Sequence, residues 1–146
     1  MQPIEDRLAI EDLLLEYARA MDFGEIDAVA ALFTLDGRVR DISGKLWDTA
    51  AGGPRGFATR WLTPPDARRG QHWIQRVRTE RISDDAYRIL SYWSSTRWTA
   101  DSTAPVMGAL GLYTDTVVRL DGRWMFQEKV IDRWETTGIE TPPPKE

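Results

Sequence analysis

The sequence predicts an α+β protein in which three N-terminal helices pack on a strongly curved antiparallel sheet. Apolar residues recur at helical spacing in the first part of the chain, whereas from residue 38 onward they mostly alternate with polar ones. Long alternating segments joined by short turns are typical of a bent antiparallel meander. A folded domain is supported by the composition, since 42% of the 146 residues are hydrophobic.

Residues 3–21 are predicted to form the first helix. Their apolar positions fall on one stripe: Ile10, Leu13, Leu14, Tyr17, Ala20 and Met21. Phe23 and Gly24 should end this helix, because glycine adopts the left-handed conformation of a helix cap. Further helices are expected at residues 26–33 and 54–62, and Asp36 with Gly37 is typical of a turn.

The rest of the chain is predicted to be mostly strands. They are expected at residues 38–42, 45–49, 72–82, 87–99, 106–120 and 123–135. Asp121 with Gly122 is a strong hairpin signal. Residues 63–70 carry two prolines and are predicted to be a loop that forms a mobile lip beside a site. We expect one domain at residues 1–135 and an irregular, proline-rich tail at 136–146.

The overall composition excludes several classes of function. A net charge of −4 argues against a nucleic-acid surface. The absence of cysteine excludes disulfides and thiolate chemistry, and a single histidine excludes a histidine-rich metal site. No apolar run approaches the roughly 20 residues of a membrane span. An acidic N-terminus gives no sign of a signal peptide. We therefore expect a cytoplasmic protein with no membrane or nucleic-acid partner and no metal.

Four polar residues are candidates for chemistry. Tyr17 lies on the apolar stripe of the first helix, Asp22 lies at its end, Asp41 lies in the first strand, and His72 begins a later strand. Taken singly, each also has a structural explanation as a core, capping or surface residue. Tyr17 and Asp22 are about 140° apart on a regular helix, so they share a pocket only if Asp22 sits where the chain turns back.

Together these residues could perform acid–base catalysis. A buried Asp22 that accepts a hydrogen bond from one imidazole nitrogen of His72 fixes the tautomer and raises the basicity of the other nitrogen. His72 could then take a proton from carbon or hydroxyl, and Tyr17 could donate to an oxygen that becomes negative.

Cations on the last strand form a second group of candidates. Lys129 and Arg133 share one face with Ile131. If that face lines a pocket, either cation could hold a carboxylate or polarise a leaving group. A surface ladder of alternating charge is the competing interpretation.

Two segments and the histidine between them resemble a known family. The segments EYARAMDFGEIDAVAALFTLDGRV and GLYTDTVVRLDGRWMFQEKVIDRW, with His72 opening a strand between them, resemble the SnoaL-like branch of the nuclear-transport-factor-2-like superfamily. The resemblance implies a cone-like α+β barrel that forms homodimers or homotrimers. It also implies a pocket that takes a small hydrophobic or aromatic substrate without a cofactor.

Within this family, dehydratases and dehydrochlorinases use an Asp–His pair, which Asp22 and His72 match, and the dehydratases add a Tyr at the position of Tyr17. Lys129 falls where relatives often carry Arg on the last strand. Arg76 replaces the Asn that the family has four residues after the histidine. The resemblance therefore implies a dehydratase-type lyase.

Other activities in the superfamily remain open. The resemblance to ketosteroid isomerase and polyketide cyclases implies an enzyme that uses Tyr17 and Asp41. Ketosteroid isomerase also uses an Asp on a later strand, and that position falls near Gly111 or Leu112 in this sequence. Arg97 and Asp132 match part of the residue set that an epoxide hydrolase requires. A non-catalytic small-molecule binding module is the alternative from a different class.

Overall fold

The computed structural model describes residues 2–64, 70–98 and 103–136. Its helices and strands follow one another in the order α1 (Ile4–Phe23), α2 (Ile26–Ala31), β1 (Phe33–Arg40), β2 (Leu46–Trp47), η1 (Thr49–Ala51), α3 (Gly53–Leu62), β3 (Gly70–Ser83), β4 (Ala86–Arg97), β5 (Val106–Leu120), β6 (Arg123–Arg133) and η2 (Trp134–Thr136). The predicted α+β class, with three α-helices against a curved sheet, is confirmed within these residues.

The sheet is mixed rather than wholly antiparallel. Its strand order is β2-β1-β6-β5-β4-β3. The meander from β3 to β6 is antiparallel as predicted, but β1 pairs with β6 in parallel. The parallel pair forms only when the whole chain folds, because it joins the first long strand to the last. The alternation of apolar and polar residues along either strand does not show whether the pair is parallel or antiparallel.

The turn predicted at Asp36 and Gly37 is wrong. Strand β1 runs through both residues, and its register with β6 shifts between Phe33 and Arg38. A Cβ at Gly37 would lie 2.8 Å from both the Phe33 Cβ and the Thr34 carbonyl oxygen. The glycine therefore serves the close approach of backbone in a bulged strand, rather than a reversal of the chain.

Two other glycines act as predicted. Gly24 has φ of 71° and its N–H donates to the Met21 carbonyl oxygen at 3.2 Å, so it caps α1. Asp121 and Gly122 both have positive φ, at 50° and 78°, in the turn between β5 and β6. Positive φ at both central residues suits a tight hairpin turn.

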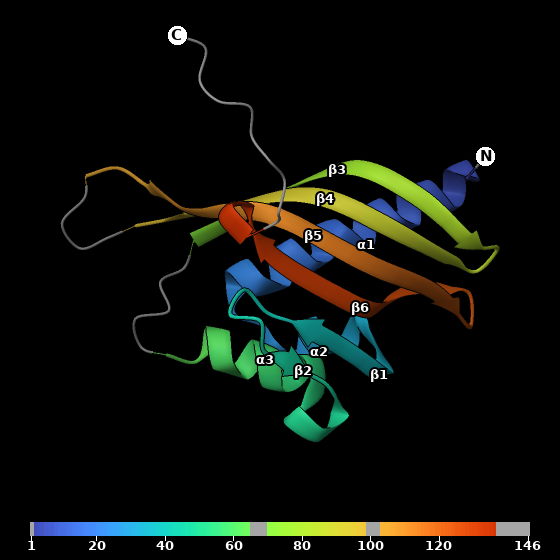
Figure 1. Cartoon of the computed structure of the whole chain (residues 1–146), viewed down its shortest axis with the longest axis horizontal. Helices are drawn as coiled ribbons and strands as arrows, with labels where there is room; N and C mark the ends of the chain where they lie inside the picture. Colours follow the sequence, from blue (N-terminus) through green and yellow to red (C-terminus); the bar gives the residue numbers. More distant parts are fainter. Residues whose placement is uncertain (1, 65–69, 99–102, 137–146) are drawn as a thin grey trace, which may run out of the picture.

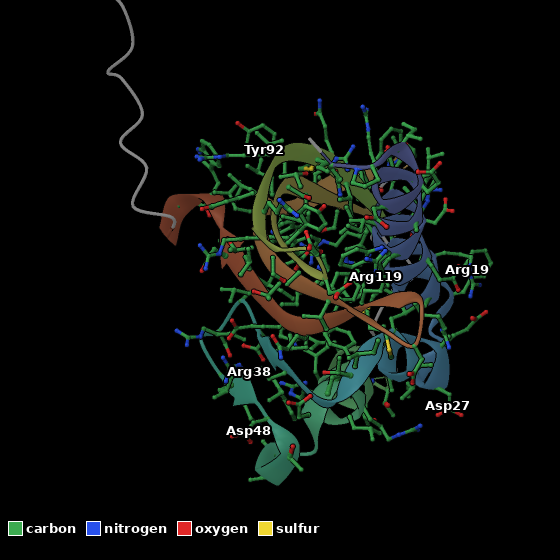
Figure 2. The ribbon with its side chains drawn as sticks, turned by 90° about the vertical axis from the view of Figure 1, so that its right-hand side faces the viewer. Arg19, Asp27, Arg38, Asp48, Tyr92 and Arg119 are labelled. Atoms are coloured by element: carbon green, nitrogen blue, oxygen red, sulfur yellow. The ribbon has the colours of Figure 1, made fainter. Side chains whose placement is uncertain are left out.

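The core lies between α1 and the concave face of the sheet. Figure 1 shows α1 crossing behind the long strands, with α2, α3, β1 and β2 gathered on one side. Figure 2 shows the strands curving around this core and Tyr92 on their outer side. The largest fully buried side chains include Tyr17, Tyr113, Phe126 and Lys129. The concave face therefore holds aromatic rings and one buried cation together.

Some expectations concern residues outside the described ranges. Residues 65–69 of the predicted lip and residues 137–146 of the predicted tail belong to this group. Within the described part, no helix is long and apolar enough to cross a membrane.

Candidate active site

The end of α1 and the start of β3 form an Asp–His pair. The Asp22 Oδ1 lies 2.6 Å from the His72 Nδ1. The His72 backbone N–H also donates to the same carboxylate, at 2.9 Å to Oδ1 and 3.2 Å to Oδ2. One carboxylate thus fixes both the backbone and the ring of the histidine, in the carboxylate–imidazole arrangement that the sequence predicts.

The pair borders a cavity of about 840 Å³. It lies between the end of α1, helix α3 and the concave side of the sheet. Its wall contains the aromatic side chains of Tyr17, Phe23, Phe57, Trp61, Trp93, Trp98 and Tyr113. The Asp22 and His72 side chains are 18% and 24% exposed, so both are reachable but largely removed from water. A small cyclic molecule fits the size and apolar character of this cavity.

A second hollow of about 790 Å³ also borders Asp22 and His72. It lies beside β3 and β4, and Trp73, Tyr92 and Trp134 contribute to its lining. The Asp–His pair therefore stands where the two hollows adjoin.

Tyr17 lines the cavity, and we call the part of the wall formed by Tyr17 and Tyr113 the cavity floor. It is 1% exposed, and its ring meets those of Tyr113 and Phe126 edge-on, with centroids 6.0 and 5.8 Å away. Burial raises the pKa of the Tyr17 phenol well above its ordinary value, and the nearby Tyr113 and Asp115 raise it further. The phenol therefore stays protonated and can act as a hydrogen-bond donor.

Asp41 also borders the cavity, but its carboxylate is engaged locally. Its oxygens accept from the Ser43 N–H at 2.9 Å, the Ser43 Oγ at 2.6 Å, the Lys45 N–H at 3.2 Å and the Trp47 Nε1 at 2.7 Å. Burial alone would raise the pKa of Asp41, but these hydrogen bonds hold it below its ordinary value. A carboxylate with four donors and a lowered pKa is a poor general base.

Lys129 does not reach the described wall of the cavity. It is fully buried, and its Nζ lies 2.8 and 3.0 Å from the two carboxylate oxygens of Asp115. Burial lowers the pKa of Lys129 and raises that of Asp115, and each charge opposes the shift of the other. The predicted role of Lys129 in touching a substrate or leaving group finds no support in this position.

The two arginines of the prediction occupy different places. Arg76 lies on β3 away from the described cavity wall, and its Nη2 is 3.4 Å from the Glu11 carboxylate on α1. Arg133, at the end of β6, lines the cavity. Of the two residues that partly match an epoxide hydrolase, Arg97 lines the cavity, whereas Asp132 is not among the described lining residues.

Two aromatic residues of the site were missed by the sequence reasoning. Trp93 and Tyr113 stack with centroids 5.4 Å apart and planes at 11°. The Trp93 Nε1 donates to the Asp132 carbonyl oxygen at 3.1 Å, and a Cβ at Gly111 would lie 2.9 Å from that nitrogen. Alternation along β4 and β5 was the available signal, since it places both residues on the buried face.

No metal cluster is present in the described residues, where no group of three or more His, Asp or Glu side chains is arranged to hold an ion.

Comparison with known proteins identifies the family. The model of the SnoaL-like domain matches residues 2–130. The chain belongs to the SnoaL-like domain family. No match was found among the curated proteins.

Solved structures with the same fold carry names of different activities. A candidate scytalone dehydratase from Novosphingobium aromaticivorans is 20% identical, with 89% of this chain and 85% of that chain covered and a TM-score of 0.72. A candidate aromatic ring hydroxylase from the same species is 29% identical, with 91% and 92% covered and a TM-score of 0.74. A type 2 hexachlorocyclohexane dehydrochlorinase is 19% identical, with 97% and 95% covered and a TM-score of 0.73. The predicted SnoaL-like family is confirmed by the family model, and these similar structures share the fold.

Proposed function

We propose that this SnoaL-like protein is a lyase of the dehydratase type that acts on a small hydrophobic cyclic molecule. The observation that carries the proposal is the 2.6 Å contact between Asp22 and His72 at the wall of an aromatic-lined cavity. Names of two similar structures, a candidate scytalone dehydratase and a dehydrochlorinase, also support an elimination reaction.

The proposed elimination uses His72 as the base. Asp22 accepts the Nδ1–H of the imidazole and leaves Nε2 as the acceptor. Nε2 takes a proton from a carbon beside the one that bears a hydroxyl group. The electrons of that C–H bond form the new double bond, and the hydroxyl leaves as water after it receives a proton from the imidazolium.

Tyr17 completes the proposed site as a hydrogen-bond donor. A carbonyl or enol oxygen on the substrate gains negative charge when the proton is removed. A phenol that remains protonated in a buried setting stabilises such an oxygen more strongly than water does.

The isomerase and the binding module are less well supported. An isomerase that uses Asp41 requires a free carboxylate, but four donors already occupy this one. A binding module would be favoured by separation of Asp22 from His72 or by a cavity filled with tryptophan. Instead the two side chains touch, and a volume of about 840 Å³ is open.

The test is loss of water from hydroxylated cyclic compounds, followed by mass spectrometry. We expect His72→Ala and Asp22→Asn to lower turnover by about 10²- to 10⁴-fold, because each removes the activated base. Gln127→Ala is a control, since this exposed residue on β6 is not among the described lining residues of either hollow. Full activity in a folded His72→Ala protein would overturn the proposal.

A further inference from the structure

A buried cation lies directly beneath the tyrosines of the cavity floor. The Lys129 Nζ is 4.3 Å from the ring centroid of Tyr17, 4.0 Å from that of Tyr113 and 4.6 Å from that of Phe126. Tyr17 and Tyr113 line the cavity, whereas Lys129 and Asp115 are not among its described lining residues. The two rings thus form a layer between the charged pair and the cavity.

Burial of this pair is costly and is not explained by stability. Lys129 and Asp115 have 0% exposed side chains, and they face each other across β5 and β6. Removing two charges from water often costs more than their attraction returns, so apolar residues of similar size are commonly as stabilising. An effect on the aromatic groups that the cation touches is one reason for a cation at this point.

The rings supply a route for such an effect. A cation over the face of an aromatic ring is attracted to its π electrons, and the attraction grows when water is excluded. It draws electron density from the phenol oxygen into the ring, and so opposes Asp115, whose charge adds to burial in raising the pKa of both phenols. It also restricts the tilt of both rings, because Asp115 holds the ammonium in one place at 2.8 and 3.0 Å.

We propose that Lys129, held by Asp115, is a positioning residue that fixes and polarises the phenols of Tyr17 and Tyr113 as donors to an oxygen that carries negative charge. The proposal rests on the proposed function, since it assigns these phenols to the floor of the same site. It also defines the ligand class: a cyclic molecule with an oxygen that is, or becomes, an enolate or phenolate.

Direct binding tests this inference without any turnover. The probes are 4-nitrophenolate and nitrobenzene, which share the ring and the nitro group but differ in the anionic oxygen. Both affinities are measured by titration calorimetry at a pH where 4-nitrophenol is ionised. Their ratio reports how well Tyr17 and Tyr113 stabilise an oxyanion. Failure to find a lyase substrate would leave this ratio unaffected, so the two proposals can fail separately.

The decisive variant replaces both charges, Asp115→Leu with Lys129→Met, and so leaves no unpaired ion in the core. We expect it to retain a cooperative thermal transition and to lose about three- to thirtyfold in preference for 4-nitrophenolate. If this variant does not fold, Asp115→Asn with Lys129→Gln removes the charges while keeping polar groups of similar size, and the same loss is expected.

A second ion pair, which joins β1 to β6, provides the control. Arg38 is exposed and Glu128 is partly exposed, with the arginine Nε 2.8 Å from the carboxylate. Arg38→Met with Glu128→Leu makes the same chemical change and should leave the preference for 4-nitrophenolate unaltered. An unchanged preference in the Asp115/Lys129 variants, equal loss of both probes, or no preference in the wild type would overturn the inference.

Discussion

Mutation of Asp41 can distinguish a structural role of this carboxylate from a catalytic one. Its side chain is 3% exposed and accepts hydrogen bonds from two backbone N–H groups, one hydroxyl and one indole. Asp41→Ala should therefore destabilise the fold rather than act on chemistry alone. The indole of Trp47 decides the size of the effect, because it is 7% exposed and its Nε1 would lose its partner.

The expected cost follows from these contacts. A buried donor left without a partner costs about 1–3 kcal/mol, and the three donors near the surface can turn to water at smaller cost. We expect Asp41→Ala to lower the free energy of unfolding by about 2–4 kcal/mol. Trp47→Phe removes the same contact from the other side, so a double-mutant cycle should give a coupling of about 1–3 kcal/mol.

The pH dependence gives an independent check with a fixed sign. The folded pKa of Asp41 lies below its ordinary value, so its contribution to stability is present above the unfolded pKa. It is lost as the pH falls through the folded pKa. The advantage of the wild type over Asp41→Ala should therefore shrink below about pH 4.

Urea unfolding followed by tryptophan fluorescence at several pH values measures all of these quantities. Asp41→Asn adds a test of chemistry, since it keeps the shape but places an amide where the Trp47 indole donates. An Asp41→Asn protein with wild-type stability and no activity would contradict the structural assignment and favour the isomerase.

Three further predictions concern other parts of the fold. Gly111→Ala should cost about 3 kcal/mol or more in urea unfolding, because its Cβ would lie 1.8 Å from the Asp132 carbonyl oxygen. Phe126→Ala should cost about 3–5 kcal/mol, since this ring is 0% exposed in the core, and a cost below 1 kcal/mol would show that the site collapses freely. Leu35→Ser should change stability by less than about 0.5 kcal/mol in the same assay, because Leu35 is fully exposed on β1.

Local chemistry explains which elements were predictable. Helix α1 could be read from its apolar stripe, and its end from Gly24, because both depend on residues close in the chain. The hairpin at Asp121 and Gly122 was predictable for the same reason. The turn predicted at Gly37 failed because a glycine can serve a bulge as well as a turn, and only the strand beside it decides.

The candidate site shows the same division. The sequence by itself determined that Tyr17, Asp22 and His72 are chemically suited to one another, and it anticipated that the end of α1 allows two of them to share a pocket. Tertiary structure decided which charged groups meet. The pairing of β5 with β6 buries Lys129 against Asp115, and the turn after β1 ties Asp41 to Trp47. Such contacts depend on strand register and the direction of side chains in space, which alternation along one strand does not specify.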